Sequence, residues 1–105
     1  GYDHAYYKFY VFLRRETLAP NWNQRRIIES LSGRGVPCFS GICTEIYREK
    51  AFVDAGLGPS QPLPTAAKRA EETLLFLVHP TLTASHMTWM ASQIHAVLNE
   101  AIGAA

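Results

Sequence analysis

The side chains with the most reactive chemistry are two cysteines, Cys38 and Cys43, which lie five residues apart. Zinc sites need a second ligand pair at a matching spacing, and none accompanies this one. On an extended segment an odd separation turns two side chains to opposite faces, which disfavours a disulfide between them. The pattern therefore predicts two reduced thiols in a cytoplasmic protein, with no metal site.

The remaining polar residues offer little self-contained chemistry. Four histidines are spread along the chain: His4, His79, His86 and His95. None pairs with another at the spacing of metal ligands on one element. Ser40-Gly41 could present a hydroxyl and a backbone amide to an anion, although a plain turn explains this dipeptide better. The sequence has no nucleophile elbow and no phosphate-binding glycine loop, so it predicts no complete active site.

Length and composition indicate one small globular domain. The chain has 105 residues, of which 48% are hydrophobic and 18% charged. A formal net charge of +1 gives no strong field for nucleic acid or an anionic membrane. No apolar run reaches the length of a membrane span. The chain opens on Gly1-Tyr2-Asp3, so we expect residues 1–105 to be one domain cut from a longer protein.

Period-two alternation over residues 5–13 predicts a strand. Its core face carries the apolar set Ala5, Tyr7, Phe9, Val11 and Leu13. The opposite face carries His4, Tyr6, Lys8, Tyr10 and Phe12, which is too apolar for plain exposure to solvent. Either a further layer of this chain covers that face, or a partner does.

Helical spacing predicts a helix after this strand, and an extended segment after the helix. Asn21 is expected to cap the helix, with Gln24 three residues on. The buried stripe is formed by Gln24, Ile27, Ile28 and Leu31. Gly33 and Gly35 are expected to end the helix, and residues 36–42 to form a second strand.

The second half of the chain predicts a helix, a strand and a closing helix. Residues 56–64, with two glycines and three prolines, are expected to form an exposed hinge. Thr65 is expected to cap a helix over 66–73. The apolar run 74–78 predicts a central strand buried on both faces.

Thr83 is expected to cap the last helix, which has one apolar stripe: Met87, Met90, Ala91, Ile94, Leu98 and Ala101. Such a stripe with two methionines is typical of core packing. Trp89 falls on the opposite side of that helix. It either marks a docking surface or lies across a neighbouring loop.

The order of these elements and four local motifs resemble the C-terminal domain of the DegT/StrS family, whose members are pyridoxal-phosphate-dependent aminotransferases acting on nucleotide-linked keto-sugars. The motifs are His-Ala-Tyr-Tyr-Lys-Phe-Tyr-Val at 4–11, the helix ending at 31–36, Ala-Glu at 70–71 followed by 75–83, and Lys-Ala-Phe at 50–52. The resemblance covers nearly the whole chain. It implies an α/β (α+β) two-layer sandwich, with a small three-stranded sheet and flanking helices, as in the small domain of fold-type I aminotransferases.

The resemblance also implies roles for individual residues. The substrate-facing candidates are Ser40, Gly41, Ile42, Cys43, Tyr47 and His4. The candidates for contact with another domain or a dimer mate are Tyr6, Lys8, Tyr10, Phe12 and Trp89. The family commonly has His-Tyr-Pro where this chain has Gly41, Ile42 and Cys43, so the chain resembles a divergent subgroup.

In this family the Schiff-base lysine and the other cofactor-binding residues lie in a large N-terminal domain, and Lys8, Lys50 and Lys68 match no such context. The resemblance therefore implies that pyridoxal phosphate is held by a missing N-terminal domain. It implies a homodimeric parent, and a chain that alone is inactive and holds no catalytic, cofactor-binding or metal-binding residue. Two alternatives are a stand-alone domain that binds a small ligand or regulates, and an oligomerisation module.

Overall fold

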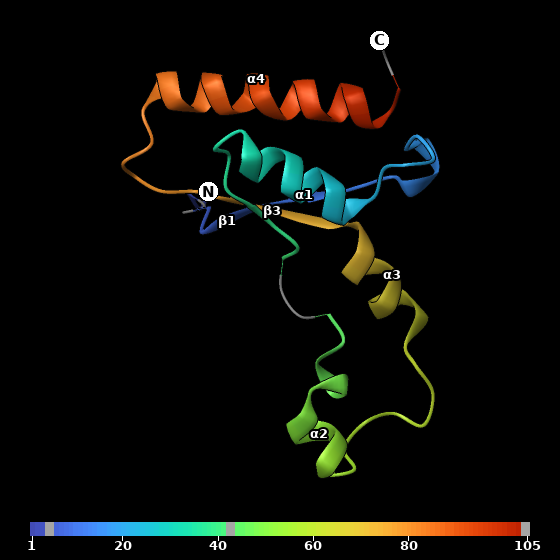
Figure 1. Ribbon diagram of the computed structural model, residues 1–105. Coiled ribbons are helices and arrows are strands. Elements are labelled where there is room, and N and C mark those ends of the chain that lie inside the picture. Colours follow the sequence, from blue (N-terminus) through green and yellow to red (C-terminus); the bar gives the residue numbers. More distant parts are fainter. Residues whose placement is uncertain (4–5, 42–43, 104–105) are drawn as a thin grey trace.

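The fold is a three-stranded antiparallel sheet with two of the helices, α1 (Gln24–Gly33) and α4 (Ala84–Ala101), stacked on one side (Figure 1). The computed structural model describes residues 1–3, 6–41 and 44–103. In chain order the elements are β1 (Lys8–Phe12), η1 (Arg15–Thr17), α1 (Gln24–Gly33), β2 (Cys38–Phe39), η2 (Ile46–Arg48), α2 (Lys50–Asp54), α3 (Pro64–Glu72), β3 (Thr73–Leu77) and α4 (Ala84–Ala101). The predicted α+β fold, with a small three-stranded sheet and flanking helices, is confirmed.

Strand β3 is central, in the order β1-β3-β2, and both neighbours run antiparallel to it. The prediction of a central strand is confirmed, although β3 begins one residue earlier than expected. Residues Thr73, Leu74, Leu75 and Phe76 are all buried, so both faces of β3 are covered. The predicted second strand over 36–42 is reduced to two residues, and Ile42 lies outside the described part of the chain.

The register divides the sheet into two faces, because directly paired residues point the same way. One row joins Phe9, Phe76 and Cys38. These side chains point toward α1 and α4, and the core forms there. The core residues are Leu13, Ile27, Leu31, Val36, Cys38, Leu74, Phe76, Val97 and Ala101. We call the opposite side, which includes Lys8, Tyr10, Phe12, Phe39, Thr73, Leu75 and Leu77, the outer face.

Helix α1 buries the predicted stripe, with Ile27 and Leu31 fully buried. The expected cap was wrong. Asn23, not Asn21, precedes the helix, and its side-chain oxygen accepts a 2.9 Å hydrogen bond from the Arg26 N–H. The helix ends as predicted, because Gly35 adopts a φ of 80° that favours glycine. Its N–H and that of Val36 donate to the carbonyls of Ser32 and Leu31.

The last two helices begin in different ways. Thr83 caps α4 as predicted, since its hydroxyl accepts from the His86 N–H at 3.2 Å. The predicted Thr65 cap of α3 was wrong. That helix starts at Pro64, whose ring presets the helical φ, and Leu63 precedes it without a side-chain cap. None of the described helices is both long and apolar enough to cross a membrane.

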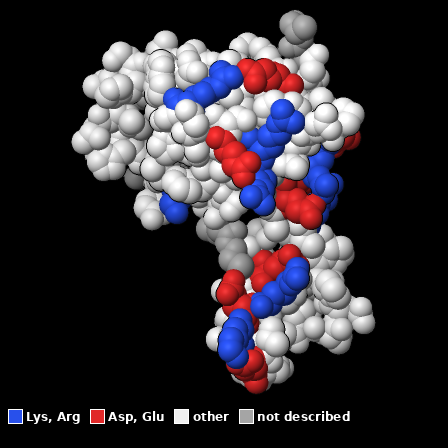
Figure 2. All heavy atoms as spheres, viewed as in Figure 1, with Lys and Arg blue, Asp and Glu red and all other residues white. Residues whose placement is uncertain are grey.

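Residues 44–63, which we call the arm, project away from the sheet and helices (Figure 1). The arm contains η2 and α2, and residues 56–63 form an exposed link from α2 to α3. Acidic and basic side chains alternate along it (Figure 2). The Lys50 ammonium lies 2.5 Å from the Asp54 carboxylate, and the Arg48 guanidinium 3.3 Å from that of Glu45.

Candidate functional site

The outer face of the sheet is an exposed aromatic surface. Tyr10 and Phe12 of β1 and Phe39 of β2 are 39%, 55% and 49% exposed. The Arg69 guanidinium lies 5.0 Å above the centre of the Phe12 ring. Several large exposed apolar side chains on one face favour contact with another part of a protein. Within the described part of the chain the central strand is covered, since Thr73 and Leu75 are buried, whereas the aromatic side chains on the two edge strands stay exposed.

Gly41 joins this outer face to the arm. Its φ is 91°, a conformation that side chains rarely adopt. A Cβ placed on Gly41 would lie 2.9 Å from Cγ2 of Thr73 and 3.6 Å from Cε1 of Tyr10. The Gly41 backbone therefore lies close to the side chains of Thr73 on β3 and Tyr10 on β1. The structure so brings together Gly41, expected to face substrate, and Tyr10, expected to contact another domain.

Tyr47 is built into the arm itself. Its hydroxyl donates to Oε1 of Glu45 at 2.8 Å and accepts a hydrogen bond from the Leu63 N–H at 3.1 Å. These two bonds tie the start of the arm to its end, so Tyr47 fixes the shape of the arm. Ser40 is exposed just before the arm. His4, Ile42 and Cys43, the other substrate-facing candidates, lie outside the described residues.

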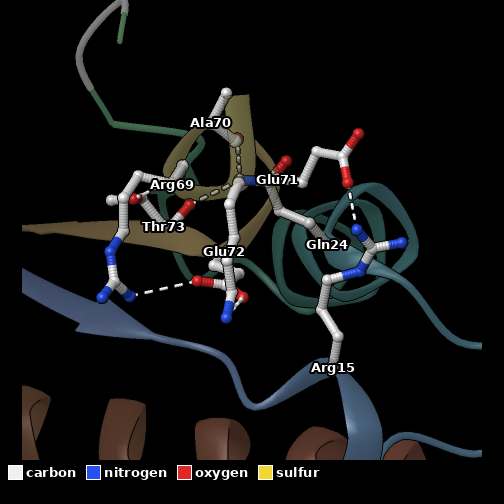
Figure 3. Close-up of polar contacts among 8 residues, drawn as sticks. Arg15, Gln24, Arg69, Ala70, Glu71, Glu72 and Thr73 are labelled. Carbon is white, nitrogen blue, oxygen red and sulfur yellow. Dashed lines mark hydrogen bonds and ion pairs between the residues drawn. The ribbon is translucent and has the colours of Figure 1, made fainter. Parts of the chain in front are cut away.

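A cluster of polar contacts lies where the chain passes from the end of the arm, through α3, back into the sheet (Figure 3). The side-chain amide of Gln24 donates to the carbonyls of Ala70 at 2.9 Å and Thr73 at 2.6 Å. These carbonyls lie at the junction of α3 and β3, where the helix leaves its last carbonyls without partners. The buried Glu72 carboxylate lies 3.0 Å from the Arg69 guanidinium and 3.7 Å from the Lys68 ammonium.

Sequence reasoning missed the role of Gln24, because it assigned this residue to the start of α1 and to the stripe that packs on the core. The same cluster includes an ion pair between Arg15 and Glu71 (Figure 3). Together these contacts fix α3 on the body, and α3 carries the end of the arm. The one available signal was a polar residue on an otherwise apolar stripe.

Trp89 lies on the helical side of the sheet, away from the outer face. It is 43% exposed, and its ring atom Cη2 lies 3.5 Å from the position of a Cβ on Gly35. The side chain therefore rests against the loop after α1, which is one of the two alternatives expected from the sequence. Tyr6 precedes β1 with a φ of 46° and borders the groove on the helical side of the sheet.

A groove lies between the core face of the sheet and the N-terminal half of α4. Its volume is about 560 Å³. On the sheet side the groove is lined by Phe9, Val11 and Phe76. On the α4 side it is lined by Met87, Met90 and Ile94, and it is also bordered by Tyr6 and His79. The expected burial of the whole α4 stripe was wrong. Val97 and Ala101 are fully buried, whereas Met87 is 59% exposed.

Cys38 is a free, buried thiol on the core face of β2. Burial raises its pKa from 9.0 to about 11, against backbone hydrogen bonds from Phe39 and Leu75 that lower it. A thiol with a raised pKa holds its proton near neutral pH and is a poor nucleophile. Cys38 therefore serves packing. No group of three or more potential metal ligands occurs among the described residues.

On a Cys43→Ser background, we expect Cys38 to react with a disulfide reagent near neutral pH only after unfolding. The folded pKa of about 11 exceeds the ordinary value of 9.0, so the stabilising effect of the neutral thiol is complete below pH 9.0. It is lost as pH rises from 9.0 to about 11, because the unfolded thiol ionises first. Denaturation across this window measures the loss, and a Cys38→Ala variant should lack it. Rapid labelling of the folded chain would contradict this assignment.

Two solved structures resemble this chain. The aminotransferase from Psychrobacter cryohalolentis is 43% identical, with a TM-score of 0.88, over 94% of this chain and 25% of that chain. The aminotransferase TlmJ from Streptoalloteichus hindustanus is 23% identical, with a TM-score of 0.70, over 90% of this chain and 23% of that chain. The chain is similar to one domain of an aminotransferase. It spans about a quarter of the length of these proteins.

Neither a family model nor a curated protein matches the chain. The structural match covers nearly all the described elements, and the second similarity, at 23% identity, supports the fold alone. The predicted likeness to a small aminotransferase domain is therefore confirmed at the level of fold.

Aminotransferases imply pyridoxal phosphate, which needs a lysine for the Schiff base and groups that hold the ring and the phosphate. The lysines here do not fit that role. The Lys50 ammonium faces Asp54, that of Lys68 faces Glu72, and that of Lys8 lies 5.1 Å from the centre of the Tyr7 ring. None of the three borders the apolar groove.

Proposed function

We propose that this chain is the C-terminal domain of a pyridoxal-phosphate-dependent aminotransferase of the DegT/StrS type, acting on a keto-sugar that is linked to a nucleotide. The observation that carries the proposal is the 43% identity, with a TM-score of 0.88, to a quarter of an aminotransferase chain. The four local motifs that resemble the DegT/StrS family support the narrower assignment. The cofactor would be held by the missing N-terminal domain.

In this proposal the outer face and the arm form one wall of the substrate cleft, since such clefts lie preferentially where domains meet. Tyr10 and Phe12 would present aromatic surface, and Gly41 would present backbone with no side chain. The absence of a side chain at Gly41 would widen the cleft at a position where the DegT/StrS family commonly has a histidine. The substrate would therefore differ in shape from those of typical family members at this point.

The parent protein in this proposal is a cytoplasmic homodimer. The arm supports this view, because its side chains Ile46, Val53 and Leu57 are 55%, 60% and 70% exposed. A projecting segment with exposed apolar side chains is suited to contact with another domain or subunit. The sedimentation of the parent protein measures this state directly.

The test uses the full-length parent, with and without residues 1–105. We expect the intact parent to bind pyridoxal phosphate, seen as its absorbance, and to transfer an amino group from glutamate to a nucleotide-linked keto-sugar, followed by mass spectrometry. The truncated parent is expected to lose the transfer. Absence of cofactor from the intact parent, or a Schiff base on residues 1–105 alone, would overturn the proposal.

A second measurement tests the wall of the cleft. Tyr10→Ala in the parent is expected to raise the KM for the keto substrate and leave the reaction with the amino donor unchanged. Arg25→Ala is the control, because Arg25 is exposed on α1 and pairs only with Glu29 among the bonds seen, at 2.8 Å. Equal kinetic constants for Tyr10→Ala and the control would contradict the assignment of the outer face to the wall of the cleft.

A further inference from the structure

The groove beside α4 is a contact surface distinct from the outer face. It lies on the opposite side of the sheet, between β1, β3 and the N-terminal half of α4. Its walls are apolar, with Phe9 56% and Met87 59% exposed across from each other. The surface over this half of α4 is formed mainly by uncharged residues (Figure 2). An exposed apolar groove of this kind is typical of a site where another segment or protein binds.

The sequence of α4 also indicates that its N-terminal half packs against another element. Its apolar stripe has helical spacing from Met87 to Ala101, which is the pattern of a helix packed along its whole length. The chain itself covers only the C-terminal half, where Val97 and Ala101 are fully buried. Toward the N-terminus the covering is incomplete: Met90 is only partly buried against the core, and Met87 is 59% exposed.

The shape of the groove indicates what kind of element fills it. Helix α1 lies between the sheet and α4 (Figure 1), and its buried Leu31 forms one end of the groove. The groove continues the layer that α1 occupies. A second helix, lying beside α1 and on the same face of the sheet, would complete that layer.

The position of the groove indicates where that helix comes from. Tyr6, which borders the groove, lies just before β1, and the chain N-terminus lies at the same end of the sheet (Figure 1). Polypeptide that precedes residue 1 in a longer parent would leave from this edge. The similar aminotransferases are about four times as long as this chain, since it covers 25% and 23% of them.

We propose that an amphipathic helix from the upstream part of the parent chain packs its apolar face into this groove, against Met87 and Met90 on one side and Phe9 and Phe76 on the other. This inference rests on the proposed function for the existence of the upstream chain. It does not depend on the substrate or the cofactor.

The test is photo-crosslinking in the intact parent. A benzophenone amino acid placed at Met87 is expected to crosslink to an upstream peptide of the same chain, identified by mass spectrometry. The matched control places it at Thr88, which neighbours Met87 on α4, is exposed and does not border the groove. A crosslink to a second copy of the parent, or no crosslink that the control lacks, would overturn the inference.

Methionine oxidation gives an independent readout that needs no substitution. The chain has two methionines, Met87 and Met90, and both border the groove. Met90 is partly buried against the core of this chain, so the readout is Met87, which we expect peroxide to oxidise about tenfold more slowly in the parent than in a synthetic peptide of residues 84–101. The protection should not change with parent concentration. Protection that appears only as the parent dimerises would assign the groove to a second copy and overturn the inference.

These readouts separate the inference from the proposed function. A parent that binds no pyridoxal phosphate yet gives the intramolecular crosslink would overturn the function and support the helix. A parent that transfers amino groups and leaves Met87 fully reactive would support the function and overturn the helix.

Discussion

Leu31→Ala is expected to lower the free energy of unfolding of this domain by about 2–5 kcal/mol. Leu31 is fully buried and lies where α1 meets the sheet. Its carbonyl accepts a hydrogen bond from the Val36 N–H at 2.9 Å, in the turn that ends α1. The cavity left by alanine would adjoin the groove beside α4, because Leu31 lines that groove. Few neighbouring side chains are therefore available to fill the cavity.

Denaturant titration followed by circular dichroism measures this loss. Ser32→Ala is the matched control, because Ser32 is the next residue of α1, is exposed, and alanine favours the helix. The unfolding free energy of Ser32→Ala should stay within about 0.5 kcal/mol of that of the unmutated domain. A domain of this size has a total stability of about 5–15 kcal/mol, so the Leu31 variant approaches unfolding at physiological temperature. Equal stability of the two variants would contradict the assigned core.

Local pattern predicted most elements of the fold, because each has a period that burial enforces. The stripe through Ile27 and Leu31 and the apolar run of β3 both lie where their spacing placed them. The Thr83 cap and the glycine end of α1 followed from backbone chemistry that acts within a few residues. Such signals are local, so one sequence is enough to interpret them.

Other features depend on contacts that pattern does not encode. The second strand spans only Cys38–Phe39, because pairing with β3 and the glycine turn at Gly41 set its length. The stripe of α4 was predicted to be buried throughout, yet Met87 is 59% exposed. A sequence shows that a face is apolar, but it does not show whether its partner belongs to the same fragment.

The candidate site was reached mainly through resemblance. The substrate-facing and contact residues came from matching motifs, and the structure adds that Gly41 packs against Tyr10. The Gln24 amide was out of reach, because its two carbonyl partners lie 46 and 49 residues away in sequence. Hydrogen bonds of a polar side chain to distant backbone follow from the fold and leave no periodic trace.

Gly41→Ala is expected to destabilise the domain by about 2–5 kcal/mol, as the sum of two effects. The first is conformational, because a φ of 91° disfavours any residue with a Cβ. The second is steric, because the new Cβ would lie 2.9 Å from Cγ2 of Thr73, a buried residue of β3. Relief of this contact requires the backbone to lift away from the outer face, which would displace the arm.

Two further variants separate these effects. Gly33→Ala is the control, since a Cβ there meets nothing within 4 Å and the residue belongs to α1; its stability should be equal or higher. Thr73→Ser removes Cγ2 and keeps the hydroxyl that donates to the Arg69 carbonyl at 2.7 Å. On the Thr73→Ser background, Gly41→Ala should therefore cost less, and the difference is the coupling energy of a double-mutant cycle.

The same cycle distinguishes a structural from a substrate-facing role for Gly41. If this residue positions the arm in a parent aminotransferase, Gly41→Ala should raise the KM for the keto substrate, and Thr73→Ser should partly restore it together with stability. If Gly41 faces the substrate directly, the added methyl should raise the KM whether or not Thr73 is changed. Unchanged stability in Gly41→Ala would contradict both, because the positive φ and the close approach to β3 would then carry no cost.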